Sequence, residues 1–252
     1  MNKSNSYTPV AADYEQVRGG ERRARDVVEP LLRWLPEGPE PLIGDVGAGT
    51  GIVGSLVAAT GRTVLGFDLS IEMLAQAKPR PFAGLAQGDA QALPVRDGSL
   101  DAVYFVWVMH HVASVEQTLS EALRVLRPGG RLISLSGLYL GTPDELGEIT
   151  LPMSRRLRPE QYAQDASVAS VATEIGFHPV GTDVATGHYQ KSPSAAAREL
   201  VDRQFSYLWN LDDATWAGEV TPVVDALRAL PDPDRARDRV SEHVMVVFDK
   251  AH

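Results

Sequence analysis

The sequence lacks cysteine altogether and has no long apolar run. Without cysteine there are no disulfides, no thiolate metal sites and no cysteine nucleophile. The most apolar run, residues 102–109, is far shorter than the roughly 20 residues that span a bilayer. Residues 1–20 contain no apolar stretch of the signal-peptide type. We therefore expect a cytoplasmic protein that does not enter a membrane.

Positive charge is also scarce. The 252 residues include 24 Lys and Arg against 33 Asp and Glu, which gives a formal net charge of −9. Nucleic-acid binding by counterion release needs clustered Lys and Arg, so this balance argues against a DNA or RNA substrate. No group of His, Asp and Glu has the spacing of metal ligands, and we expect no metal site.

What the sequence does contain is a regular alternation of strand and helix patterns. The expected strands are 41–46, 63–67, 82–86, 100–108 and 131–136, and the expected helices between them are 52–60, 70–77 and 114–126. Such alternation predicts an α/β fold with a doubly wound, mostly parallel sheet and right-handed crossovers, a Rossmann-like arrangement.

Less regular segments flank this core. Residues 13–35 have a helical pattern that Pro30 should kink or divide. After residue 137 we expect a helix at 166–175, a strand at 180–189, helices at 193–205 and 222–230, and a last strand at 244–248. The sheet would thus have seven strands. The expected domains are an N-terminal helical lid (1–40), a core (41–192), a helical cap over the acceptor site (193–240) and the last core strand (241–252).

A glycine-rich loop follows the first strand. Asp45 is followed by Gly47, Gly49 and Gly51, and alternating glycines between a strand and a helix let a ligand approach the backbone. The loop indicates a nucleotide but does not say which one. The run Gly49-Thr-Gly-Ile-Val-Gly54 also fits a dinucleotide fingerprint, and Asp68 stands where an acid that binds ribose is expected.

Two acidic residues favour a different nucleotide. Asp45 would repel a pyrophosphate, whereas it suits the cationic amino group of a methionine moiety. Asp89 follows the third strand and is followed by the small residue Ala90. A carboxylate there can accept from an adenine amino group, with space for the flat ring beside it. Both residues favour S-adenosylmethionine over NAD.

Several motifs in order also resemble one family. The chain resembles the class I methyltransferases of the ubiquinone/menaquinone-biosynthesis-like group, the methyltransferase-11 type, across residues 42–136. The motifs that carry this resemblance are Asp45-Val-Gly-Ala-Gly-Thr-Gly51, Gly66-Phe-Asp-Leu-Ser70, Gly88-Asp-Ala-Gln-Ala-Leu-Pro94, Gly98-Ser-Leu-Asp-Ala-Val103, Met109-His-His-Val112 and Arg124-Val-Leu-Arg-Pro-Gly-Gly130.

The resemblance implies S-adenosyl-L-methionine as cofactor and S-adenosylhomocysteine as product. It implies that Asp45 and the loop hold the methionine end, that Asp68 binds both ribose hydroxyls, and that Asp89 with Ala90 receives the adenine. The full set of cofactor-binding residues that it implies is Tyr14, Arg18, Asp45, Gly47, Ala48, Gly49, Asp68, Leu69, Met73, Asp89, Ala90, Phe105 and Val106. Tyr14 and Arg18 would belong to a lid, or to an ordinary surface helix.

The acceptor side is less defined. His110 and His111 follow a strand and are candidates for a general base, although the family pattern that they match is usually structural. Residues that could line an acceptor pocket, or that only pack, are Tyr139, His188, Tyr189, Tyr207 and Trp209. We expect methyl transfer to a small organic acceptor at O, N or C, including in specialised metabolism. An NAD-dependent oxidoreductase and a protein that uses the cofactor structurally, such as a cyclase, remain alternatives, and monomer and homodimer are both open.

Overall fold

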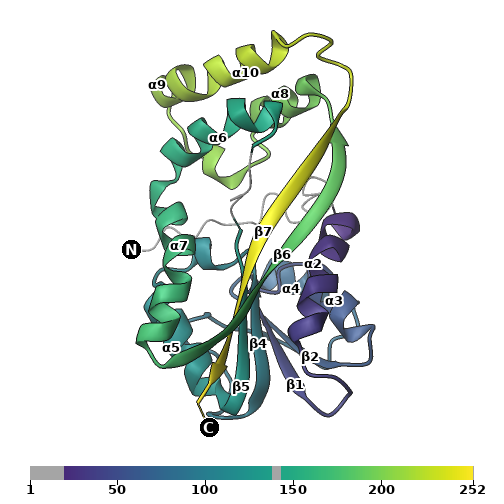
Figure 1. Cartoon of the computed structure of the whole chain (residues 1–252), viewed down its shortest axis with the longest axis vertical. Helices are drawn as coiled ribbons and strands as arrows, with labels where there is room; N and C mark the ends of the chain where they lie inside the picture. Colours follow the sequence, from purple (N-terminus) through teal and green to yellow (C-terminus); the bar gives the residue numbers. More distant parts are fainter. Residues whose placement is uncertain (1–19, 138–142, 252) are drawn as a thin grey trace. The chain divides into compact units, whose positions relative to one another are not determined.

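The computed structural model describes residues 20–137 and 143–251, in which the described strands form a seven-stranded sheet (Figure 1). Tyr14, Arg18 and Tyr139 lie outside the described residues. The strand order is β3-β2-β1-β4-β5-β7-β6. The first five strands pair in parallel, in line with the predicted mostly parallel sheet, and β7 pairs antiparallel with β5. The strands are β1 (Leu42–Val46), β2 (Thr63–Asp68), β3 (Gly84–Gln87), β4 (Leu100–Val106), β5 (Leu126–Leu135), β6 (Phe177–Lys191) and β7 (Arg237–Lys250).

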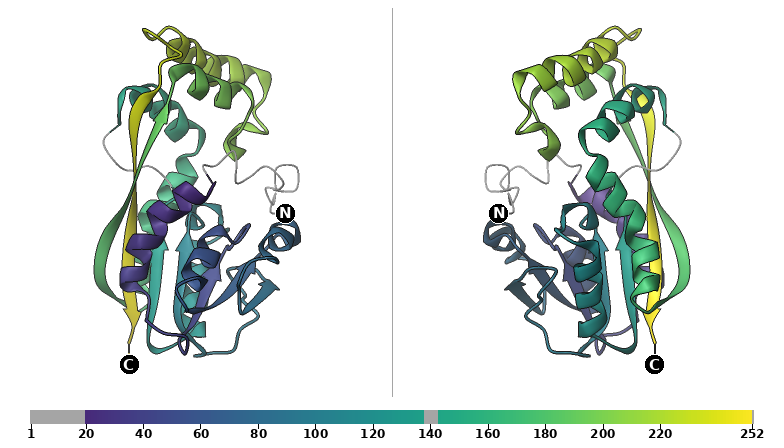
Figure 2. Two further views of the ribbon diagram at one scale, coloured as in Figure 1. Left: turned by 90° about the vertical axis from the view of Figure 1, so that its right-hand side faces the viewer. Right: turned by 90° about the vertical axis from the view of Figure 1, so that its left-hand side faces the viewer.

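Helices cover both faces of this sheet, as the two side views in Figure 2 show. Helices α2 (Gly20–Trp34) and α3 (Ile52–Ala58) pack on one face and share an apolar core with alternate residues of the central strands. Helices α5 (Val115–Val125) and α7 (Pro159–Glu174) pack on the other face. Helix α4 (Ile71–Ala77) connects β2 to β3, and a short 3₁₀ turn, Met109–His111, follows β4. No described helix is both long and apolar enough to cross a bilayer.

The chain divides into two compact units. The first contains residues 1–139, 163–185 and 243–252, and the second contains 140–162 and 186–242. In its described part the second unit has its own apolar core. This core is built from α6 (Glu145–Leu157), α8 (Pro193–Val201), α9 (Asp213–Thr215), a π-turn (Trp216–Val220) and α10 (Thr221–Arg228). Helix α7 and strands β6 and β7 each have residues in both units.

Three local expectations need correction. Helix α2 continues through Pro30 to Trp34, so Pro30 does not divide it. Helix α6 was not expected at all, because Pro152 and the glycines around it hide its pattern. Its start does carry a signal, since the Asp144 carboxylate accepts from the N–H of Gly147 at 2.8 Å as an N-cap. Strand β5 begins at Leu126 and not at the expected residue 131, and β6 and β7 extend beyond their expected ends.

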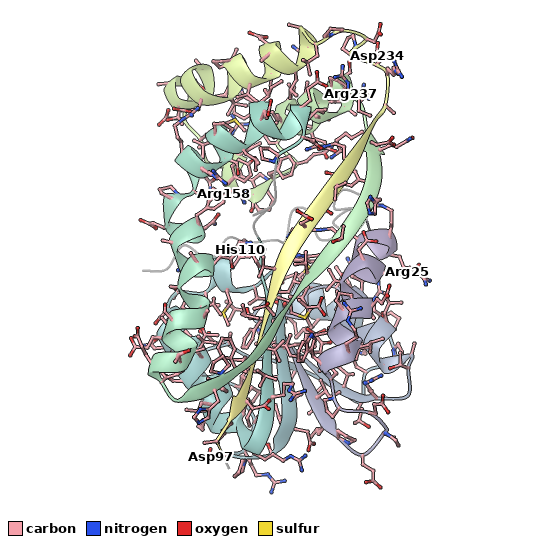
Figure 3. The ribbon with its side chains drawn as sticks, in the orientation of Figure 1. Arg25, Asp97, His110, Arg158, Asp234 and Arg237 are labelled. Atoms are coloured by element: carbon pink, nitrogen blue, oxygen red, sulfur yellow. The ribbon has the colours of Figure 1, made fainter. Side chains whose placement is uncertain are left out.

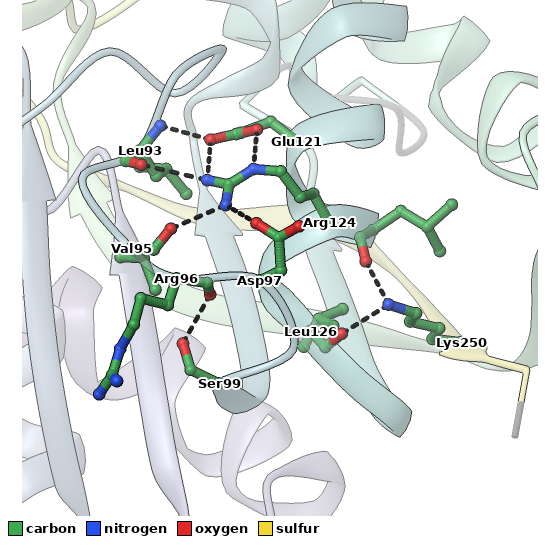
Figure 4. A network of polar contacts seen from close by, with 10 residues as sticks. Leu93, Val95, Arg96, Asp97, Ser99, Glu121, Arg124, Leu126 and Lys250 are labelled. Carbon is green, nitrogen blue, oxygen red and sulfur yellow. Dashed lines mark hydrogen bonds and ion pairs between the residues drawn. The ribbon is translucent and has the colours of Figure 1, made fainter.

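A guanidinium fixes the loop that leads into β4 (Figure 4). Arg124 of α5 donates to the Leu93 and Val95 carbonyls at 3.2 and 2.8 Å. It also donates to the carboxylates of Glu121 and Asp97, and the Glu121 carboxylate accepts from the N–H of Leu93 at 2.6 Å. The Arg124 side chain therefore joins the motif at residues 88–94 to the motif at residues 124–130. This contact gives the two motifs a structural reason to occur together.

Candidate cofactor-binding site

The glycine loop lies at the carboxyl end of β1, where it crosses to α3. The N–H groups of Gly47 and Ala48 both donate to the Phe67 carbonyl at the end of β2, at 2.7 and 2.9 Å. Gly47, Gly49 and Gly51 have φ values of 75°, 57° and 79°. Side chains other than glycine rarely adopt these angles, so the turn itself requires the alternation of glycines.

The surroundings of the three glycines differ. A Cβ on Gly47 would meet the Val108 side chain, and one on Gly51 would lie 2.7 Å from the Phe82 ring. A Cβ on Gly49 would meet nothing within 4 Å. Gly47 and Gly51 therefore allow close packing within the protein, whereas Gly49 faces open space. Gly49 is the position at which a ligand can come against the backbone.

Asp45 lies at the base of this loop and is almost completely buried, with 3% of its surface exposed. In the sheet it pairs with Tyr104 of β4, and the two side chains share the face that α2 and α3 cover. The pKa of the Asp45 carboxyl is raised to about 7. Burial is the largest cause, and the charge of Asp68 adds to the rise, while the nearby Tyr104 hydroxyl and the Gly54 N–H offset part of it. Among the described residues, neither Asp45 Oδ2 nor the Tyr104 hydroxyl has a hydrogen-bond partner of regular geometry.

Asp68 ends β2 directly opposite the loop. Its Oδ2 accepts from the N–H of Gly49 at 2.7 Å, and its Oδ1 accepts from the N–H of Ser70 at 2.8 Å. Burial raises the pKa of this carboxyl, and the N–H groups of Ser70, Gly49 and Leu69 counteract that rise. Each carboxylate oxygen has two lone pairs, so each can accept one further hydrogen bond. The Asp68 side chain thus holds Gly49 in place and can still accept hydrogen bonds from the two hydroxyl groups of a diol.

The other residues that we predict to contact adenosine differ in how much of their surface is exposed. Leu69 is 59% exposed next to Asp68, and Ile71, which sequence reasoning missed, is 57% exposed. Met73 is only 4% exposed and points into the core, so its surface for a ligand is small. Asp89 is exposed, and its Oδ1 accepts from the N–H of Gln91 at 2.9 Å. Ala90 beside it is partly buried against the core.

At the end of β4, Phe105 and Val106 are buried with exposures of 0% and 9%. Their side chains are therefore packed inside the protein, and a contact of their backbone with the cofactor stays a prediction. The next residue, Trp107, has a φ of 61°, a left-handed conformation that is uncommon outside glycine. Its ring lies 3.6 Å from the Arg23 guanidinium carbon and 6.0 Å from the His243 ring. The chain therefore turns sharply at the edge where the glycine loop lies.

Several proteins similar to this chain in sequence are named methyltransferases. A family model described as a methyltransferase domain matches residues 44–134. The demethylmenaquinone methyltransferase of Beutenbergia cavernae is 33% identical over 169 residues, which cover 57% of this chain and 68% of that protein. The chain belongs to the class I S-adenosylmethionine-dependent methyltransferases.

Other relatives are matched over a smaller share of their length. An uncharacterized 37.1 kDa protein in a transposon of Streptomyces fradiae is 40% identical over 129 residues, 48% of this chain and 35% of that protein. The chain thus spans about a third to two thirds of the length of these two curated relatives. The comparisons name methyltransferases and do not favour the oxidoreductase alternative.

Solved structures share the fold at low sequence identity. The [4+2]-cyclase SpnF superposes with a TM-score of 0.62 at 19% identity, over 98% of this chain and 95% of that one. A phosphoethanolamine N-methyltransferase from Haemonchus contortus, in complex with phosphomonomethylethanolamine and S-adenosylhomocysteine, has a TM-score of 0.57 at 19% identity. The match covers 96% of this chain and 57% of that one.

In this methyltransferase the two candidate bases differ in exposure. His110 is 8% exposed, and its ring lies against Gly137, where a Cβ would collide with it. His111 is exposed, and the two ring centroids are 3.9 Å apart. His110, labelled in Figure 3, thus packs within the first unit and His111 is exposed, and a catalytic role for either stays a prediction.

The predicted acceptor-pocket residues His188, Tyr189, Tyr207 and Trp209 belong to the second unit. His188 is exposed on β6, and the Tyr189 ring lies 5.7 Å from Lys191 Nζ. The Trp209 indole N–H donates to the Arg203 carbonyl at 2.8 Å, which is a packing role. Tyr207 stacks on Phe205 with centroids 5.6 Å apart. Their part in acceptor binding stays a prediction.

Sequence reasoning missed several residues that shape the site. These are Tyr104, Trp107, Val108, Phe82 and Arg80, whose Nε donates to the Thr50 carbonyl at 2.8 Å. Only Tyr104 carries a sequence signal, as the one phenol in β4, where the other residues from Ala102 onward are apolar. No group of three or more potential metal ligands occurs among the described residues.

Proposed function

We propose that the chain transfers the methyl group of S-adenosylmethionine to a small organic acceptor at O, N or C. The observation that carries this proposal is the pairing of Gly49 with Asp68. A glycine that faces open space is held by a carboxylate that can still accept two hydroxyl hydrogen bonds, next to the exposed side chain of Leu69. This arrangement suits a ribose between the loop and an adenine. The family membership supports the same cofactor.

The chain's residues would bind and orient both partners. When bound, the cofactor supplies a methyl group on a positively charged sulfur, which is already activated for transfer. Asp45 would hold the ammonium group of its methionine end, and Asp68 its ribose. Alignment of an acceptor with the methyl group contributes up to about 7–11 kcal/mol to catalysis, so the protein needs few reacting side chains. For this reason the sequence indicates residues for cofactor binding more clearly than residues for acceptor binding.

A base is needed only for an acceptor that reacts through an un-ionised hydroxyl, an ammonium group or a weakly acidic carbon. His111 is our candidate because it is exposed, whereas His110 packs against Gly137. The neutral imidazole is a base near physiological pH. We further propose that the second unit selects the acceptor and that the protein acts in specialised metabolism.

Ligand titrations test the cofactor part of this proposal. S-adenosylhomocysteine should bind in calorimetry and NAD should not; binding of NAD alone would refute the proposal. Asp68→Ala should weaken S-adenosylhomocysteine strongly, because two charge-assisted hydrogen bonds to the ribose are lost. Glu72→Ala is the matched control, because Glu72 is an exposed carboxylate four residues away on α4. The Glu72→Ala protein should bind S-adenosylhomocysteine with the same affinity as the wild type.

The use of the fold by a [4+2]-cyclase makes a second outcome worth testing. Incubation of methyl-labelled S-adenosylmethionine with a panel of phenols, amines and activated carbon acids should release S-adenosylhomocysteine and a labelled product. Tight S-adenosylhomocysteine binding with no labelled product across all three acceptor classes would favour a structural use of the cofactor instead.

A further inference from the structure

Arg158 stands at the junction of α6 and α7 in the second unit (Figure 3). Its Nη2 donates to the Ser154 hydroxyl at 2.5 Å, and that hydroxyl lies 3.2 Å from the Tyr162 hydroxyl. Ser154 is 5% exposed. The guanidinium is therefore tied to a buried, hydrogen-bonded group and not extended into solvent.

Two aromatic rings flank the same cation. The Arg158 guanidinium carbon lies 4.4 Å from the Tyr207 ring centroid and 5.5 Å from that of Tyr162. Both distances are in the range of a cation–π interaction. Tyr207 is itself held by stacking on Phe205 and by packing against the apolar core of the second unit. The two rings thus hold the guanidinium in place.

The charge of Arg158 has no carboxylate partner among the described residues, whereas the nearby Arg156 and Arg239 are paired. Arg156 contacts Glu219 at 2.7 Å, and Arg239 contacts Asp144 at 2.6 Å. The Nε–H of Arg158 is buried and has no hydrogen-bond acceptor in the part of the chain that the structure describes. A buried donor without a partner costs roughly 1–3 kcal/mol, and more when the group is charged, so such a group calls for an explanation.

We propose that Arg158, with Tyr162 and Tyr207, binds a carboxylate of the acceptor substrate. The inference rests on the proposed methyl transfer and narrows its acceptor to an organic acid. A planar guanidinium presents N–H groups in a fork that matches a carboxylate in two parallel hydrogen bonds. Arg155 beside the same Tyr162 ring is exposed, so Arg158 supplies the one partly buried positive charge at these rings, which suits a carboxylate better than the double charge of a phosphate monoester. The two tyrosine rings suit a flat group next to that carboxylate.

Binding of small probes tests the site without knowledge of the acceptor. The full chain, saturated with S-adenosylhomocysteine, is titrated with benzoate, phenyl phosphate and benzamide by ligand-observed NMR. Benzoate should bind, benzamide should not, and phenyl phosphate should bind more weakly than benzoate. Arg158→Gln should weaken benzoate at least about tenfold, equivalent to about 1.4 kcal/mol. Arg158→Lys keeps the charge but loses the fork, so it should weaken benzoate as well.

The matched control is Arg155→Gln. Arg155 is an exposed arginine in the last turn of α6, three residues before Arg158, and its guanidinium lies 5.9 Å from the same Tyr162 ring. Benzoate affinity in this variant should equal that of the wild type. Equal losses in the Arg155 and Arg158 variants, equal binding of benzoate and benzamide, or preference for phenyl phosphate would each overturn the proposal. If Arg158→Gln does not fold, the Arg158→Lys variant decides by the same comparison.

The S-adenosylhomocysteine titration separates this inference from the proposed function. The protein could bind benzoate through Arg158 and yet fail to bind S-adenosylhomocysteine. That result would support the anion site and refute the proposed methyl transfer. Tight S-adenosylhomocysteine binding without any benzoate binding would refute the anion site alone.

Discussion

Asp45 and Tyr104 are paired residues on the neighbouring parallel strands β1 and β4, and both side chains are buried. The pKa of Asp45 is raised to about 7, mainly by burial, and burial together with the Asp45 charge raises the pKa of Tyr104 well above 10. Near neutral pH, therefore, the free protein holds a proton on Asp45 in part of the molecules. A cationic ligand group next to Asp45 favours release of that proton.

We predict that the affinity for S-adenosylhomocysteine rises as pH increases from 5 to about 7. Below a pH of about 7 the ammonium group of the ligand must first displace the proton of Asp45, and this cost disappears once Asp45 is ionised. Above a pH of about 8 the affinity should fall again, because the free α-amino group loses its own proton. Calorimetry in buffers of different ionisation enthalpy measures both the affinity and the released proton.

Tyr104→Phe provides the matched variant for this pH profile. The Tyr104 hydroxyl lowers the pKa of Asp45, so its removal should raise that pKa further and shift the rise in affinity to higher pH. A profile that is identical in the two proteins would contradict the coupling between these residues.

Asp45 should also set the pH dependence of folding stability in the absence of ligand. Its pKa is higher in the folded state, at about 7, than its ordinary value of 3.8. The folded state therefore holds a proton that the unfolded state releases, and stability falls as pH rises from about 4 to about 7. Asp45→Asn removes this loss, which is at most about 4 kcal/mol. Urea unfolding of both proteins at pH 5 and pH 8 gives the difference; a pH-independent difference would contradict the assignment.

Gly49→Ala should reduce cofactor affinity more than it reduces stability. The new methyl group meets no protein atom, but it enters the space that we assign to the ligand, and a φ of 57° costs about 1–2 kcal/mol for alanine. Gly61→Ala is the control, because Gly61 has a φ of 88° and equally open surroundings on the far side of α3. Thermal unfolding should show similar losses in both variants. Only Gly49→Ala should weaken S-adenosylhomocysteine, and equal affinities would place the ligand elsewhere.

Arg124→Met should lower the free energy of unfolding by about 2–3 kcal/mol. It removes hydrogen bonds to two carboxylates and two carbonyls and leaves the loop before β4 unheld. Arg96→Met is the control, since Arg96 is exposed on the same loop and only its backbone carbonyl accepts a hydrogen bond. Denaturant unfolding of the two variants should separate them clearly; similar midpoints would show that the network contributes little.

The parallel core was predictable because its information is local. Apolar strands, glycines with positive φ and the caps at Ser70 and Ser114 each leave a mark in a few consecutive residues. Asp45, Gly49 and Asp68 were identifiable for the same reason. Tyr104, by contrast, meets Asp45 only through strand register, and Arg158 meets Tyr207 across a long stretch of chain. Such contacts depend on tertiary packing, which no local pattern encodes.

The strand order has a consequence for synthesis of the protein on the ribosome. Strand β7 lies between β5 and β6, although β6 precedes it in the chain by the whole segment 192–236. When β6 emerges, its place in the sheet does not yet exist, and the apolar edge of β5 remains unpaired until β7 has been made. An exposed strand edge can pair with another chain. The interval between synthesis of β6 and of β7 is therefore the period in which this chain most needs a chaperone, and slower translation across residues 192–236 should increase its aggregation.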